Sequence, residues 1–166
     1  MRRAAPLVAA LLVAASCYGS NGNLTESGKG LPELSIDFPE SSAPGTTQVA
    51  VLTVTNPGPE QMSSLVVAFA RVGPLQGGGE LPTPIVDGAA KGVNPAVVDV
   101  SPEPNEISRA AVEFFFDGLA EGKSAEITFE LKVPAARGEA ANSVTVYDGA
   151  EPARAAGARL QTIVES

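Results

Sequence analysis

The sequence predicts an all-β protein: an antiparallel, immunoglobulin-like β-sandwich of about 8–9 strands. Residues 125–133 carry the first indication, because apolar and polar side chains alternate strictly along them, as in a strand with one buried face. The second indication is that 14 prolines and 17 glycines divide the 166-residue chain into short segments. The third is that no stretch has convincing helical periodicity. Together these features favour antiparallel sheets that each bury one face.

Alternation and turn residues place the individual strands. We expect strands at residues 34–38, 48–55, 65–72, 85–86, 97–100, 108–116, 125–133, 142–147 and 158–164. Residues 56–59, Asn-Pro-Gly-Pro, form a turn, because proline fixes φ and glycine accepts a positive φ. Residues 149–157 are expected to be a loop, and the alanine-rich residues 150–158 leave a turn of helix open.

Phenylalanine and aliphatic side chains must hold the predicted core, since the chain has no tryptophan and its single cysteine cannot form an internal disulfide. Phe114 and Phe116 share the inward face of their strand with Val112, whereas Phe115 points the other way. At roughly 1.5–3 kcal/mol for each fully buried large apolar side chain, a dozen such residues offset the absence of an inter-sheet disulfide.

The first residues have the layout of an export signal. Residues 1–16 carry Arg2 and Arg3, then an apolar run, then small residues, and are too short to span a bilayer as a permanent helix. Cys17, the only cysteine, follows directly. This arrangement resembles the bacterial lipoprotein signal, although Ala14 stands where that pattern prefers leucine. The resemblance implies a diacylglyceryl group on the Cys17 thiol, and the alternative is a free thiol beside an ordinary signal peptide.

The domain organisation follows from that signal. We expect residues 1–16 to be a lipoprotein signal peptide, 17–32 a flexible tether rich in Gly, Ser and Asn that starts at lipidated Cys17, and 33–166 the sandwich domain. The protein would be exported and anchored to a membrane by its N-terminal lipid, at the outer membrane or cell surface.

Three motifs in order resemble a bacterial surface-repeat family of unknown function. They are TVTNPGPE at residues 53–60, GLAEGKSAEITFELKVP at 118–134 and ANSVTVYDG at 141–149. The family is immunoglobulin-like and extracellular, so the resemblance implies the same fold and compartment, with no catalytic residues to carry over. This chain departs from the family in having a single copy and a long loop, residues 73–94.

Composition excludes several classes of function. The net charge of −8 repels phosphate backbones, so no nucleic acid is expected as a partner. The absence of histidine removes the commonest general base and most catalytic zinc sites. Lys123 and Ser124 point to opposite faces of a strand and cannot form a dyad by themselves. We therefore expect no catalysis and no cofactor. A crosslink of Lys132 to Asn142 is disfavoured, because Lys132 lies on the polar face.

Two weak binding sites remain as hypotheses. Asp87, Asp117 and Asp148 each precede a glycine at a strand end, and such carboxylates can gather around calcium at one end of a sandwich. The alternative is ordinary turn chemistry. Phe115 and Tyr147 suggest a platform on which sugars stack, and the alternative is packing in the core or between the sheets.

The sequence thus predicts a non-enzymatic, lipid-anchored envelope domain that engages a protein or envelope component. The long loop, residues 73–94, or an open sheet edge is the expected contact surface. The second reading is a carbohydrate- or calcium-dependent adhesion module. Neither the partner nor the oligomeric state follows from the sequence.

Overall fold

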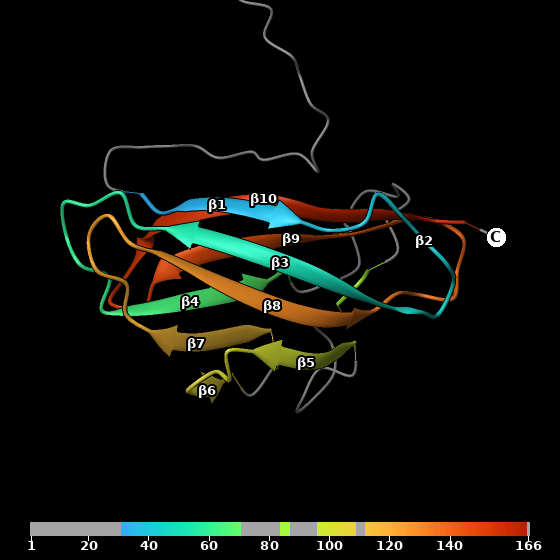
Figure 1. Ribbon diagram of the computed structural model, residues 1–166, viewed down its shortest axis with the longest axis horizontal. Helices are drawn as coiled ribbons and strands as arrows, with labels where there is room; N and C mark the ends of the chain where they lie inside the picture. Colours follow the sequence, from blue (N-terminus) through green and yellow to red (C-terminus); the bar gives the residue numbers. More distant parts are fainter. Residues whose placement is uncertain (1–30, 71–83, 87–95, 109–111, 166) are drawn as a thin grey trace, which may run out of the picture.

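The computed structural model describes residues 31–70, 84–86, 96–108 and 112–165, and this part of the chain is all-β (Figure 1). Within these ranges there is no helix of the length and apolarity that a membrane crossing requires. The strands are β1 (Glu33–Asp37), β2 (Ser41–Ser42), β3 (Thr47–Thr55), β4 (Ser64–Phe69), β5 (Val97–Ser101), β6 (Glu106–Ile107), β7 (Glu113–Asp117), β8 (Ser124–Lys132), β9 (Gly138–Asp148) and β10 (Glu151–Val164).

Two sheets pack face to face. One has four strands in the order β1-β3-β8-β5, and the other has six in the order β2-β10-β9-β4-β7-β6. Neighbouring strands are antiparallel except β2, which runs parallel to the end of β10. The predicted antiparallel, immunoglobulin-like sandwich is therefore confirmed, with about ten strands.

Alternating side chains from both sheets meet in one core. Buried residues occupy every second position of β3, β8 and β9, as the sequence pattern predicts. Phe129 of the four-stranded sheet packs edge-to-face against Phe69 and Phe114 of the six-stranded sheet. The centroid of its ring lies 5.1 Å from the centroid of each of the other two rings. This aromatic trio joins the sheets without a disulfide, in an arrangement that aromatic quadrupoles favour.

Four local predictions need correction. Residues 150–158 are neither a loop nor a turn of helix, because β10 begins at Glu151 and pairs with β9 along almost its whole length. Ile85 and Val86 are buried but form a bend rather than a strand. The predicted strand at 108–116 begins only at Glu113 among the described residues, and β4 ends at Phe69 rather than at residue 72.

Strand β5 is the last strand of its sheet among the described residues. Its register against β8 shifts between Val97 and Asp99, so the strand carries a bulge, and Pro102 follows its end. Asp99 lies directly opposite Glu130 on the outward face. Bulges, charges and proline are devices that protect exposed sheet edges from pairing with other chains.

The connections divide between the two ends of the sandwich. We call the end formed by residues 56–63, 117–123 and 148–151 the turn end, and the end formed by residues 43–46, 84–86, 96 and 132–138 the loop end. Glu33 pairs with Thr55, so the chain enters the sandwich at the turn end. The connection from β4 to β5, which contains the whole predicted long loop, leaves and returns at the loop end, as the directions of the two strands show (Figure 1).

Candidate functional site

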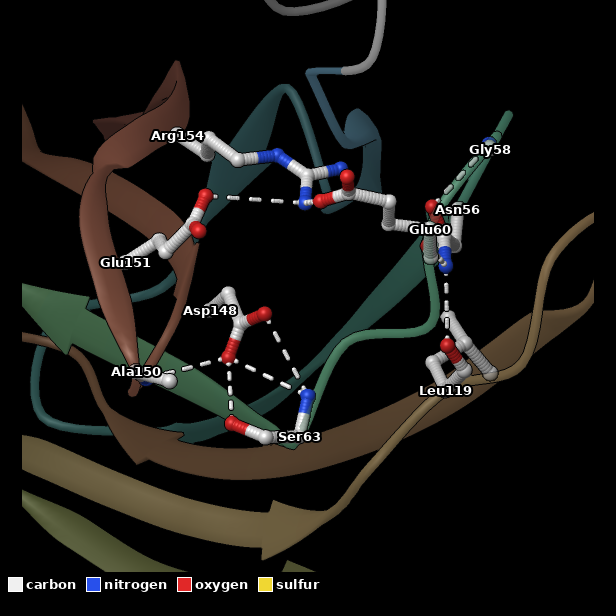
Figure 2. Close-up of polar contacts among 9 residues, drawn as sticks. All are labelled: Asn56, Gly58, Glu60, Ser63, Leu119, Asp148, Ala150, Glu151 and Arg154. Carbon is white, nitrogen blue, oxygen red and sulfur yellow. Dashed lines mark hydrogen bonds and ion pairs between the residues drawn. The ribbon is translucent and has the colours of Figure 1, made fainter.

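Two turns singled out in the sequence, residues 56–60 and 118–122, meet at the turn end, where Asn56 connects them. Asn56 is 1% exposed, and its side-chain amide donates to the carbonyls of Glu60 and Leu119 at 2.8 Å each. Its side-chain oxygen accepts from the Gly58 amide at 3.1 Å (Figure 2). All the polar atoms of this side chain are thus engaged by backbone, which explains the Asn-Pro-Gly turn as a structural device.

Asp148 is a second brace at the same end. One carboxylate oxygen accepts from the Ser63 hydroxyl at 2.7 Å and from the Ala150 amide at 3.0 Å, and both oxygens lie within 3.3 Å of the Ser63 amide (Figure 2). Burial alone would raise the pKa of Asp148, but hydrogen bonds from the Ser63 hydroxyl and from the amides of Ala150, Ser63 and Ser64 outweigh it and lower this pKa. The carboxylate therefore fixes the start of β4 against the end of β9.

Arg154 adds an ionic contact above this brace. Its guanidinium lies 3.3 Å from a Glu60 carboxylate oxygen and 3.8 Å from one of Glu151 (Figure 2). Both glutamates are largely exposed, and such pairs contribute about 0–1 kcal/mol. The contact connects the β3–β4 turn to the start of β10 and belongs to the scaffold.

The predicted calcium ligands are not brought together where the structure describes them. Asp117 and Asp148 both lie at the turn end, but on strands that flank β4, and they point to opposite faces of the sheet. Asp117 is exposed and accepts from the Asn105 side-chain amide at 2.9 Å, whereas the Asp148 oxygens are occupied by protein donors. Asp87 lies outside the described residues. Within the described ranges, no group of three or more His, Cys, Asp or Glu is placed to hold a metal.

Phe115 and Tyr147 do lie on one face, although that face is not in the core. Both are half-buried on the outer face of the six-stranded sheet, and both are register partners of Val66, which separates them. The Tyr147 hydroxyl donates to a Glu113 carboxylate oxygen at 3.3 Å. Burial, then the negative charge of Glu113 and this hydrogen bond, raise the pKa of Tyr147. The alternative reading, packing in the core or between the sheets, is therefore wrong for these two side chains.

The described middle of the long loop is attached to the sandwich by Asn142. This side chain is 5% exposed on the inner face of β9, and its oxygen accepts from the amides of both Ile85 and Val86 at 2.7 Å. Its amide group donates to the Val86 carbonyl at 3.3 Å. Ile85 and Val86 are themselves fully buried. A segment without regular secondary structure thus satisfies its backbone through one amide side chain, as buried polar groups require.

A shallow pocket of about 350 Å³ opens beside this attachment at the loop end. Ile85 and Val133, both 1% exposed, contribute buried apolar surface, and Pro84 and Pro134 also line it. Lys132 is the one charged residue in the lining. It is exposed and makes no side-chain hydrogen bond or ion pair within the described part of the chain.

The remaining residues considered for chemistry have structural surroundings. Ser124 and Thr55 share a hydrogen bond of 2.7 Å between their hydroxyls on the outer face of the four-stranded sheet. Asn142 faces the core of one sheet, whereas Lys132 lies on the outer face of the other. A crosslink between Lys132 and Asn142 therefore has no geometric support.

Comparison with known proteins shows a likeness of fold to solved structures but no match in sequence. No family model matches the sequence, and no curated protein matches it. Solved structures similar to this fold include a CARDB domain from Pyrococcus furiosus in complex with di-metal ions, at 13% identity and a TM-score of 0.43, covering 89% of this chain and 98% of that one. A cohesin module from a Clostridium perfringens family 33 glycoside hydrolase has 11% identity and a TM-score of 0.45, covering 82% and 98%. A PapD-like domain of human CEP192 has 20% identity and a TM-score of 0.41, covering 82% and 85%.

Proposed function

We propose that this protein is a lipid-anchored, non-enzymatic interaction domain of a bacterial cell envelope, which presents its loop end to a protein or envelope partner. Residues 1–16 act as the export signal, acylated Cys17 holds the membrane, residues 17–32 are the tether and residues 33–166 are the displayed sandwich. The signal pattern and the single cysteine support the anchor. One acyl chain gives marginal binding, so permanent attachment needs the two or three chains of a bacterial lipoprotein.

The observation that carries this proposal is that the chain enters the sandwich at one end and the pocket lies at the other. The chain enters at the turn end, where Glu33 pairs with Thr55 (Figure 1). The pocket and the attached loop segment lie at the loop end. A tether of about 16 residues has a root-mean-square reach of roughly 20–25 Å if it behaves as a flexible coil. The surface most readily turned away from the membrane is therefore the one that holds the long connection.

The polar chemistry of the described residues also fits a scaffold better than an active site. The pKa of Tyr147 is raised by burial, by the charge of Glu113 and by their hydrogen bond, and the pKa of Asp148, despite its burial, is lowered by hydrogen bonds from Ser63 and nearby backbone amides. Contacts within the scaffold thus account for both shifts. Among the described residues, every buried side-chain nitrogen and oxygen has a hydrogen-bond partner. These features support a rigid frame that positions loops, which is where binding residues commonly lie.

Intact mass spectrometry of the protein extracted from its own membranes tests the anchor. We expect a mature N-terminus at Cys17 that carries the mass of at least a diacylglyceryl group. The variant Cys17→Ala should lose membrane association on fractionation while its sandwich stays folded. A chain cleaved elsewhere without lipid, or a Cys17→Ala variant that remains in the membrane, would refute lipid anchoring.

A carbohydrate-binding module is the second candidate, and the row formed by Phe115, Val66 and Tyr147 favours it. Two half-buried rings on the outer sheet face, with Glu113 beside Tyr147, match the aromatic and polar groups that sugars require. Titration with soluble envelope polysaccharides distinguishes the candidates. Binding that falls at least about tenfold in Phe115→Ala, taking about 1.4 kcal/mol per factor of ten, would support it. Equal retention of the wild type and this variant by the polysaccharide would exclude these rings as the platform.

A further inference from the structure

We infer that the loop-end pocket is a binding site for the carboxy-terminal residue of a partner polypeptide, an apolar side chain with an adjacent free carboxylate. This inference deepens the proposed function, because it assigns a ligand chemistry to the end that the tether leaves free. The pocket lies between the turn before β3, the end of β8 and the attached segment 84–86.

The walls of the pocket fit an apolar side chain. Ile85 and Val133 are almost fully buried and Pro84 and Pro134 are half-buried, so a side chain that enters meets mainly carbon. Burial of the ligand's apolar side chain in such a site favours binding. The volume of about 350 Å³ is at the low end for ligand sites, which suits a single residue better than a long acyl chain.

The walls are also held in place before a ligand arrives. Asn142 fixes Ile85 and Val86 through two hydrogen bonds of 2.7 Å. On the other side, the Gly45 amide donates to the Pro134 carbonyl at 3.2 Å, and the Val133 amide donates to the Thr46 carbonyl at 2.8 Å. A preorganised pocket loses less conformational entropy on binding.

Lys132 supplies the charge complementarity. The chain has 19 acidic residues against 11 basic ones, so a cation free of ion pairs beside an apolar pocket stands out from its surroundings. Two of the three ion pairs between described residues hold Arg154 and the third holds Arg159, whereas Lys132 is in none. An ammonium group next to an apolar site selects ligands whose apolar group lies close to an anion.

Two matched peptides test this inference on the full chain purified in a non-ionic detergent. Both are acetylated hexapeptides that end in leucine; one has a free carboxylate and the other a carboxamide. We expect the carboxylate peptide to shift the amide resonances of Ile85, Lys132 and Val133 saturably, and the carboxamide peptide to bind at least about tenfold more weakly.

Two variants locate the binding. Lys132→Gln should bind both peptides equally and weakly, while the matched control Lys123→Gln, at the turn end, keeps the preference for the carboxylate. Ala135→Trp, an exposed position in the pocket lining, should block both peptides without unfolding the domain. Unchanged amide spectra outside the loop end confirm that each variant is folded.

Three results would overturn the inference: equal binding of both peptides by the wild type, an undiminished carboxylate preference in Lys132→Gln, or no resonance shifts at millimolar peptide. Tighter binding of decanoate than of the carboxylate peptide would also overturn it, in favour of a lipid ligand. A lipidated Cys17 together with any of these results would leave the anchor standing and reject only the pocket assignment.

Discussion

Replacement of Asn142 by alanine should release the segment 84–86 from the sandwich. The variant removes the acceptor of the Ile85 and Val86 amides, which lie 2.7 Å from the Asn142 oxygen in a fully buried region. Each buried donor left without a partner costs about 1–3 kcal/mol. Since two donors lose their partner, we expect the free energy that holds this segment to fall by about 3 kcal/mol.

Native-state hydrogen exchange measures this loss directly. A change of about 3 kcal/mol corresponds to roughly 100-fold faster exchange of the Ile85 and Val86 amides. Amides in the middle of β3 and β8 should change much less, because segment opening is local. The control is Asn105→Ala, which removes an exposed hydrogen bond to Asp117 and should leave both amides unchanged. Equal exchange rates at Ile85 and Val86 in Asn142→Ala and the wild type would refute the assigned role of Asn142.

Three further perturbations probe the scaffold. Asp148→Asn places an amide donor against the amides of Ser63 or Ser64, and should lower the free energy of unfolding by about 2 kcal/mol at pH 7, measured by urea denaturation. The pKa of Asp148 is lowered in the folded state, so the wild type keeps this stabilisation above the unfolded pKa near 3.8 and loses it as the pH falls through the folded pKa. The difference in unfolding free energy between wild type and variant should therefore shrink in acid. A difference that does not change with pH would contradict a role for the ionised carboxylate. Gly118→Ala places a Cβ 2.3 Å from the Met62 carbonyl oxygen and 2.6 Å from that of Ser63, and should destabilise the domain by about 1–3 kcal/mol or more in the same assay. In Gly45→Ala no atom of the described residues lies within 4 Å of the new Cβ, so this control should cost about 1 kcal/mol through its positive φ alone. Absorbance titration should show the Tyr147 phenol ionising at higher pH in the wild type than in Glu113→Gln, because that substitution removes the neighbouring charge; identical titrations would argue against the contact.

The alternation of apolar and polar residues predicted the strands that have one buried and one exposed face. β3 and β8 lie within a residue of the predicted ranges, because each has one face in the core and one in solvent. The start of β10 was missed because alanine and glycine around residue 155 carry no strong strand preference. Those residues become a strand by pairing with β9, so Ala155 meets Tyr147 and Gly157 meets Thr145. Strand propensity depends on such partners, which the local sequence does not contain.

The sites were less predictable than the fold for a similar reason. Asn142 contacts residues 56 and 57 positions away, and the pocket combines four separate segments. Asp117 and Asp148 looked equivalent as Asp-Gly turns, yet one is exposed and the other is a buried brace. Successive residues of a strand point to opposite faces of the sheet, so a difference of one residue in where the strand ends decides whether its last side chain is buried or exposed. The sequence suggested Phe115 and Tyr147 as one sugar-stacking platform, which stays a prediction, and their placement on either side of Val66 depends on the register of three strands.

The bulged edge of β5 has a consequence for molecules held at high density in a membrane plane. The proposed lipid anchor would confine many copies to a thin layer, where their effective concentration would be raised and an exposed strand would template growth of a continuous sheet from molecule to molecule. The register shift after Val97 and the facing carboxylates of Asp99 and Glu130 put irregular geometry and like charges at that edge. Two identical copies meeting there would bring four carboxylates together. The β5 edge is therefore expected to resist sheet growth between crowded copies, which would leave their loop ends free for other partners.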